Sequence, residues 1–175
     1  MCSRTRRALG RVSGLTDSRR LAVDFQLSLE SEGVGSAYPD QPLAASSHEC
    51  VGKVLQLLRA QRTGAALICD GPKLVGIVTE RDALKLMASG ADMSVPVSDV
   101  MSSSPVTIDA SATVAEAIRV MAEGGYRHLP IVDSAGKPTG VLAVHGLVHY
   151  LVDHFPETVY NLPPNPNAAR EREGA

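Results

Sequence analysis

A threonine and an aspartate three positions apart are the side chains of this sequence best placed for binding chemistry. Thr79 and Asp82 follow the apolar run 74–78 and stand at the start of a predicted helix. An ionised carboxylate can accept two parallel hydrogen bonds from a vicinal diol, and a hydroxyl at a helix start can donate to an anion. The spacing is also that of a capping box, which alone would explain both residues. The two roles are compatible, because a helix start favours anions.

Three residues spaced by four, His145, His149 and Asp153, would share one face of another predicted helix. Two histidines at this spacing can hold zinc. Gly146, however, stands where a zinc-protease motif requires glutamate. We therefore interpret this face as solvated or packed, and we predict no metal site.

The sequence contains no Gly-x-Ser-x-Gly elbow, which would present a nucleophile, and no Walker loop, which would bind phosphates. The 3 cysteines show no Cys-x-x-Cys spacing. Cys69 lies in an apolar run, so we interpret it as core filler rather than a nucleophile. We predict no catalytic residues and no obligatory cofactor.

The elements that must position these residues repeat along the chain. Residues 42–70 align without a gap on residues 105–133 at an offset of 63, and apolar positions keep step. Matched positions include Pro42 with Pro105, Leu43 with Val106, and Ile68 with Ile131. One additional turn residue in the second copy changes the offset to 64 and places Gly76 on Gly140.

Each copy predicts the same order of elements, βαββα. The first copy predicts strands at 43–45, 66–69 and 74–78 and helices from Val51 and at 80–89; the second predicts strands at 106–108, 129–132 and 140–144 and helices from Thr113 and at 145–154. A single copy of roughly 55 residues buries little core. We therefore expect an α/β (α+β) fold in which two βαββα repeats, at 41–92 and 93–155, pack face to face as a pseudo-symmetric pair.

The flanking segments differ in composition from the repeats. Residues 1–20 hold six arginines and one aspartate, which predicts a disordered basic arm; a transit peptide, a contact with an acidic partner and an upstream start codon are alternatives. Period-2 alternation from Leu21 to Leu29 predicts that residues 21–40 form a strand and a connector. The proline-rich residues 156–175 predict a flexible tail.

Three motifs in order give the chain a family resemblance. The segments GIVTERD at 76–82, MSSSPVT at 101–107 and RHLPIVD at 127–133 resemble a pair of cystathionine-β-synthase-type (CBS) domains, often called a Bateman module. The likeness covers about residues 41–155. It implies a regulatory module that binds an adenosine compound, namely AMP, ADP, ATP or S-adenosylmethionine, in a cleft between the repeats.

The resemblance also implies roles for individual residues. Thr79 and Asp82 match the family positions that bind ribose, and Arg127 and His128 match positions that contact phosphate. Apolar contacts to adenine are expected from Ile77 and from the positions near Leu43 and Thr63. A solvated turn residue and a hydrogen-bonded histidine before a strand are the structural alternatives for Arg127 and His128.

The second copy departs from the family pattern. Ala143 takes the threonine position and Gly146 the aspartate position, so the hydroxyl and the carboxylate are both lost. We therefore expect one composite site per chain, with ribose bound by the first repeat and phosphate by the second.

The overall expectation is a non-catalytic sensor of an adenosine nucleotide that forms a homodimer and signals to an unknown effector protein. A ligand-free dimerisation scaffold is the main alternative, and a metal-dependent enzyme, supported only by the histidines, is the weakest. No apolar run reaches 18 residues, so we expect no membrane partner and a cytoplasmic protein. With aromatic residues at 3%, base stacking on nucleic acid is not expected.

Overall fold

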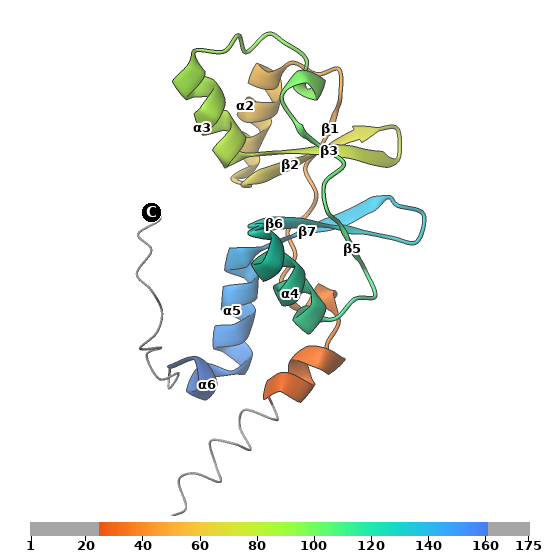
Figure 1. Cartoon of the computed structure of the whole chain (residues 1–175), viewed down its shortest axis with the longest axis vertical. Coiled ribbons are helices and arrows are strands. Elements are labelled where there is room, and N and C mark those ends of the chain that lie inside the picture. The colour runs from red at the N-terminus through yellow and green to blue at the C-terminus, as the bar shows by residue number, and fades with distance from the viewer. Residues whose placement is uncertain (1–24, 161–175) are drawn as a thin grey trace, which may run out of the picture.

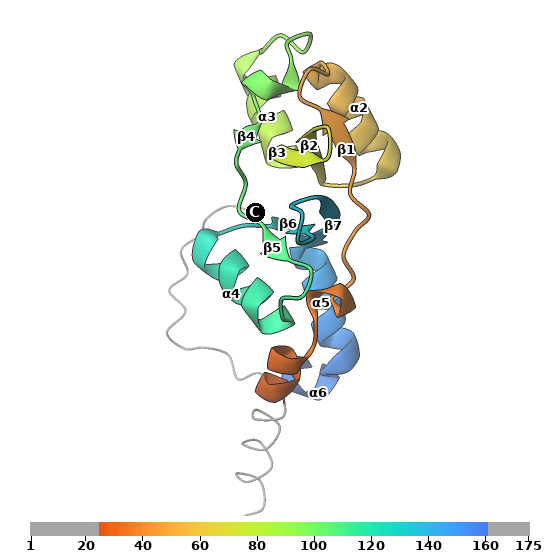
Figure 2. The same ribbon diagram turned by 90° about the vertical axis from the view of Figure 1, so that its right-hand side faces the viewer.

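The computed structural model describes residues 25–160 of the 175-residue chain. Two layered units lie one above the other along the long axis, each with its sheet turned to the middle and its helices on the outside (Figures 1 and 2). None of the helices in the described part is long and apolar enough to cross a membrane.

The first unit follows the expected order of elements. It consists of β1 (Ala44–Ser46), α2 (Val51–Gln61), β2 (Ala65–Asp70), β3 (Lys73–Thr79) and α3 (Glu80–Ser89). After the 3-10 turn η2 (Val97–Asp99), the chain adds β4 (Ser102–Ser103) to the same sheet, whose order is β1-β2-β3-β4. β1 pairs with β2 in parallel, and the other pairs are antiparallel.

The second unit repeats the first. It contains β5 (Ile108–Asp109), α4 (Val114–Gly124), β6 (His128–Val132), β7 (Pro138–Ala143) and α5 (Val144–His154), with a three-stranded sheet in the order β5-β6-β7. Thr113 caps α4 by accepting a hydrogen bond from the Glu116 N–H at 3.2 Å, as its spacing predicts. The α+β fold of two βαββα repeats is thus confirmed.

Strand register confirms the change of offset between the copies. Ile68 is paired with Gly76 in the first sheet, and Ile131 is paired with Gly140 in the second. Beyond the hairpin turn, equivalent residues are therefore 64 positions apart, so Ala143 and Gly146 occupy the places that Thr79 and Asp82 hold in the first repeat.

The strand predicted within residues 21–40 is wrong for the part that the structure describes. Residues 25–31 form a helix, and residues 21–24 lie outside the described range. Phe25 and Leu29, four positions apart, pack on the second repeat, and the ring of Phe25 meets that of Phe155 edge-on at 4.9 Å. That spacing fits a helical face, while the alternation that suggested a strand leaves Leu27 57% exposed.

The boundary of the predicted tail also needs correction. Residues Pro156–Tyr160 form a short helix, α6, directly after α5. The rest of the predicted tail, 161–175, and the predicted basic arm, 1–20, lie outside the described residues.

Residues 32–40 complete the second repeat rather than serve as a connector. Val34, in the 3-10 turn η1 (Val34–Ser36), and Ala37 are buried in the core of the second repeat. The Tyr150 hydroxyl donates to Glu32 at 2.6 Å, and burial, followed by this hydrogen bond, raises the pKa of Tyr150. Asp40 exchanges backbone hydrogen bonds of 2.8 and 3.0 Å with Val141 of β7.

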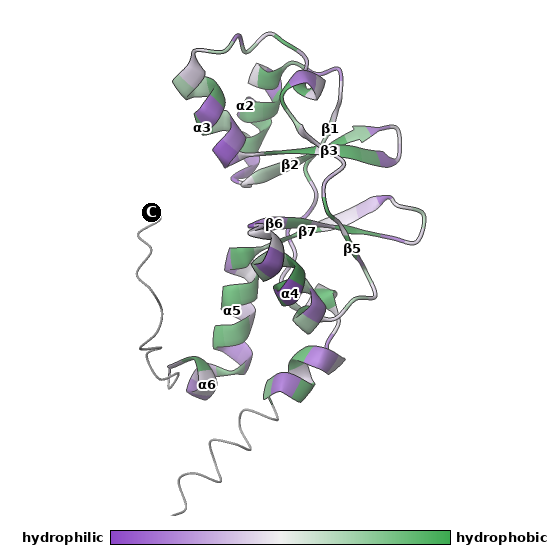
Figure 3. Ribbon diagram, in the orientation of Figure 1, coloured by the Kyte–Doolittle hydropathy of each residue, from purple (hydrophilic) through white to green (hydrophobic). Residues whose placement is uncertain are grey.

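The two sheets meet through a small apolar cluster, made of Ala65, Leu67 and Ile77 from the first repeat and Val141 from the second. Each repeat has a larger core of its own between its sheet and its helices. Hydrophobic residues accordingly dominate the strands and α5, while the start of α3 is hydrophilic (Figure 3). This polar helix start lies at the edge of the contact between the repeats.

Gly146 tests the packing of the N-terminal segment. A Cβ atom at this position would lie 2.9 Å from the Tyr38 carbonyl oxygen and 3.0 Å from that of Ala37. We expect Gly146→Ala to lower the free energy of unfolding by about 1–3 kcal/mol in urea denaturation, because backbone must move to admit the methyl group. Gly35→Ala, where nothing lies within 4 Å, is the matched control and should be nearly neutral. Equal midpoints for the two variants would contradict this packing.

Candidate binding cleft between the repeats

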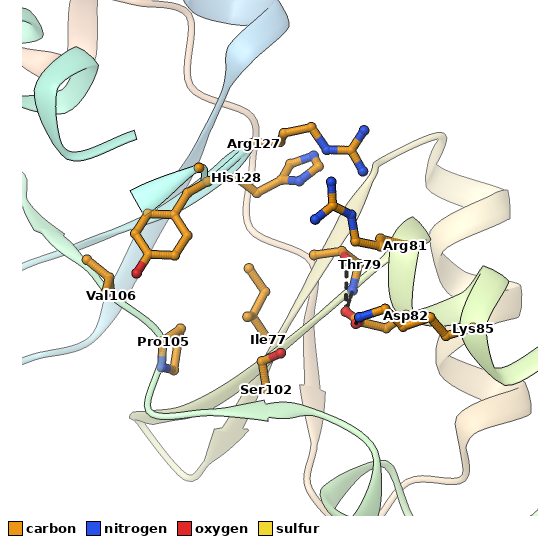
Figure 4. A pocket seen from close by; sticks show the side chains of 12 residues that line it. Ile77, Thr79, Arg81, Asp82, Lys85, Ser102, Pro105, Val106, Arg127 and His128 are labelled. Carbon is orange, nitrogen blue, oxygen red and sulfur yellow. Dashed lines mark hydrogen bonds and ion pairs between the residues drawn. The ribbon is translucent and has the colours of Figure 1, made fainter. Parts of the chain in front are cut away.

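A hollow of about 250 Å³ opens between the repeats at the start of α3. Both repeats and the segment that joins them contribute side chains to it (Figure 4). The lining residues are Ile77, Thr79, Arg81, Asp82, Lys85, Ser102, Pro105, Val106, Gly125, Tyr126, Arg127 and His128. Five of the residues expected to bind ligand, namely Ile77, Thr79, Asp82, Arg127 and His128, are therefore brought together.

Asp82 holds the start of α3 and also faces the cleft. Its Oδ2 accepts hydrogen bonds from the Thr79 N–H at 2.9 Å and from the Thr79 hydroxyl at 2.8 Å. Its Oδ1 lies 3.9 Å from Nζ of Lys85. One carboxylate oxygen is thus committed to the helix, while the other retains lone pairs for a ligand. Because the Thr79 hydroxyl donates its hydrogen bond to Asp82, it can accept a hydrogen bond from a ligand but cannot donate one to an anion in this arrangement.

The second repeat supplies the opposite wall at the start of β6. Arg127 is exposed and His128 is half-buried. His128 lies over Gly64 of the first repeat, where an added Cβ would approach its Nε2 to 2.7 Å. Burial lowers the pKa of His128, as do Arg127 and His145, whereas Glu80 and Asp40 oppose the shift. His128 therefore favours the neutral form near neutral pH and can both donate and accept a hydrogen bond.

Leu43 and Thr63 do not line this cleft. Leu43 is buried in the core of the first repeat, and Thr63 borders a different hollow, between α2 and α3. The residues 63 positions later, Val106 and Tyr126, line the cleft instead. Each cleft of a pseudo-symmetric pair combines the helix start of one repeat with the strand start of the other. The family resemblance implies adenine contacts from the first repeat, but in the structure the second repeat supplies the positions equivalent to Leu43 and Thr63. The repeat alignment already relates Leu43 to Val106.

Two cations of the cleft were also missed by sequence reasoning. Arg81 and Lys85 both project from the first turns of α3 and line the hollow with Asp82. Lys85 lies three positions after Asp82, and residues three apart are neighbours on a helix surface, so the sequence could have indicated that Lys85 lies beside Asp82. Arg81 carried no signal of its own, because its direction depends on where the second repeat packs.

The equivalent positions of the second repeat are covered by the chain itself. Ala143 and Gly146 are buried, and the backbone of residues 37–38 lies directly against Gly146. Asp40 continues this cover through its backbone pair with Val141 and an ion-pair distance of 3.7 Å to Nε2 of His145. The second repeat thus lacks the hydroxyl and the carboxylate, and residues 37–40 lie against the strand end and helix start that would carry these groups.

The histidine face of α5 makes contacts within the fold. His145 lies beside Asp40, and Asp153 accepts a hydrogen bond from the Tyr38 hydroxyl at 3.3 Å. Within residues 25–160, no group of three or more His, Cys, Asp or Glu side chains is arranged to hold a metal ion.

The lowered pKa of His128 has a consequence for stability. The unfolded chain takes up the proton near the ordinary histidine pKa of about 6.5, before the folded protein does, so stability falls as the pH drops from that value through the folded pKa. We expect His128→Gln to lose less stability than wild type between about pH 7.5 and 5.5, measured by urea denaturation. His48→Gln, at an exposed histidine before α2, should keep the wild-type loss. A His128→Gln profile that parallels wild type would contradict the assignment.

Comparison with known proteins supports the family resemblance. The family model of the CBS domain matches residues 39–89 and 97–153. The crystal structure of CBSX2 of Arabidopsis thaliana in complex with AMP has a TM-score of 0.61 at 26% identity and covers 70% of this chain and 98% of that one.

Sequence relatives include proteins of different size. An uncharacterised 17.7 kDa protein of Acidianus ambivalens is 31% identical over 104 residues, which are 59% of this chain and 63% of that protein. Inosine-5'-monophosphate dehydrogenase of Nitrosopumilus maritimus is 28% identical over 171 residues, which are 95% of this chain but only 32% of the enzyme. Because the family model covers more than half of the sequence, the chain belongs to the CBS-domain family and carries a pair of these domains.

Proposed function

We propose that this chain is a non-catalytic regulatory module that binds one adenosine nucleotide in the cleft between its repeats. The observation that carries the proposal is the meeting of a carboxylate from one repeat with cations from both repeats around a single hollow. Asp82 offers an acceptor for a vicinal diol, and Arg127 and His128 offer donors for phosphate. The AMP complex of CBSX2, whose fold is similar, favours this ligand class.

We propose one orientation for the nucleotide in the cleft. The ribose hydroxyls meet Oδ1 of Asp82 at the start of α3. The phosphate lies toward Arg127 and His128, where the positive end of α3 adds to the attraction. The adenine is left with the apolar and aromatic side chains on the other walls, namely Ile77, Val106 and Tyr126. This division of labour explains why both repeats are needed for one site.

A ligand-free dimerisation scaffold is the competing function, and a specific surface favours dimerisation in either case. Leu84 and Met87 of α3 are 68% and 61% exposed, and they border an apolar hollow with Leu55 and Leu58 of α2. Large apolar side chains gathered on one face are typical of an interaction surface. We propose that two copies of the chain associate through this face and that an effector protein reads the assembly.

Nucleotide binding predicts a thermal shift that depends on Asp82. A ligand that binds only the native state at a hundredfold excess over Kd stabilises it by about 2.7 kcal/mol. For a chain of this size the melting temperature should then rise by roughly 5–11 °C. Asp82→Asn should remove most of this rise, because a neutral amide still accepts from the Thr79 N–H but binds a diol poorly.

Glu116→Gln is the matched control, since Glu116 holds the same position in the first turn of α4 but lies outside the cleft. It should keep the full shift in differential scanning fluorimetry with AMP, ADP, ATP and S-adenosylmethionine. The nucleotide proposal is wrong, and the scaffold function replaces it, if none of the four compounds raises the melting temperature of the wild type. The same holds if Asp82→Asn shows as large a rise as the wild type.

Dimerisation is tested separately by mass. Light scattering at micromolar concentration should give twice the chain mass of 18.4 kDa. Leu84→Glu should yield a monomer, because a charge would be buried in the apolar contact. Leu27→Glu, which places the same charge at a 57% exposed leucine on the other unit, should leave the dimer intact. A monomeric wild type rules the interface out.

A further inference from the structure

A second hollow of about 560 Å³ adjoins the binding cleft, between the starts of α3 and α5. Arg127 and His128 border both hollows. These two side chains therefore stand at the boundary between the cleft and the second hollow. The residues that line it are Arg62, Gly64, Glu80, Arg127, His128, Val144, His145, Val148 and His149.

The cleft is smaller than most small-molecule sites. Its volume of about 250 Å³ is below the range of about 300–1,000 Å³ common for small-molecule sites. In the proposed binding mode the sugar lies at Asp82 and the phosphate end lies toward Arg127. The guanidinium groups of Arg81 and Arg127 come from opposite repeats and turn toward the same part of the cleft (Figure 4).

The cleft and the second hollow together carry more positive charge than one phosphate group would balance. Arg62, Arg81 and Arg127 form no ion pair with any residue in the range 25–160. A single phosphate carries about −1.5 to −2 charges at neutral pH. His145 and His149 add further donors in the second hollow, and the starts of α3 and α5 both lie beside it. Glu80 is the acidic side chain that opposes an anion there.

We propose that the site selects adenosine di- and triphosphates over the monophosphate, with the terminal phosphates bound at Arg62 in the second hollow. This inference rests on the proposed nucleotide function and adds the length of the phosphate chain. Arg62, which follows the last residue of α2 in the first repeat, lines the second hollow together with Arg127 of the second repeat. A polyphosphate would thus be held from both repeats at once, whereas a monophosphate would reach only the cleft.

Calorimetry on the full chain with AMP, ADP and ATP, in magnesium-free buffer at fixed ionic strength, tests the proposal. ATP should bind at least about tenfold more tightly than AMP, because each added charge-assisted hydrogen bond strengthens binding. Arg62→Gln should weaken ATP by about fivefold or more and leave AMP within about twofold. Glu80→Gln should strengthen ATP, since it removes the opposing charge.

Arg59→Gln is the matched control. It removes the same charge from the same turn of α2, but Arg59 does not line the second hollow, so both affinities should remain close to wild type. The polyphosphate site is wrong if AMP binds as tightly as ATP, if Arg62→Gln weakens AMP and ATP equally, or if Arg59→Gln matches Arg62→Gln; nucleotide binding itself would survive these results. Failure of every adenosine compound to bind the wild type would instead overturn the proposed function and this inference together.

Discussion

The contact between the two sheets is the constraint on which the rest of the structure depends. Only a few apolar side chains form it, with Val141 of the second repeat set against Leu67 and Ile77 of the first. Each sheet also needs a second layer on its other face, which the helices provide. The strand ends and helix starts, with their polar groups, are thereby pushed to the edge of this contact. A polar cleft beside a small apolar interface is the direct result.

The two edges of the interface differ because different segments of the chain lie beside them. At one edge, the start of α3 keeps a charged first turn, and the joining segment 101–106 leaves Val106 exposed beside it. At the other edge, residues 37–40 lie on the start of α5, and Gly146 admits their backbone. The second repeat gains an anchored N-terminal segment, whose backbone covers the Gly146 side of the start of α5. An internal duplication thus yields one open cleft and one covered edge.

Asp82 illustrates how a structural role can leave a side chain available for the binding role that we propose. Its two hydrogen bonds from Thr79 fix the first turn of α3 and, with it, the direction of the free oxygen. Capping of the helix uses only Oδ2 of this carboxylate, so Oδ1 remains available for a ligand. Orientation by a neighbour is also what a binding carboxylate requires.

The repeat and its periodicity were sufficient to predict the fold, because local patterns and their duplication agree. They predicted α3 to the residue and the equivalence of Gly146 with Asp82. The local pattern predicted a strand within residues 21–40, but residues 25–31 form a helix, because Phe25 and Leu29 pack on the second repeat from one helical face. It failed again for Leu43 and Thr63, because which repeat faces which cleft is a property of the packed pair. Arg81 could not be found for the same reason.

The number of nucleotides bound per chain tests the central claim most directly, because the claim is that one edge of the interface is open and the other is covered. Isothermal titration of the wild-type protein with the tightest-binding adenosine nucleotide measures this number without any substitution. The structure predicts one molecule per chain. Two molecules per chain would show that residues 37–40 do not cover the second edge, and would contradict the account.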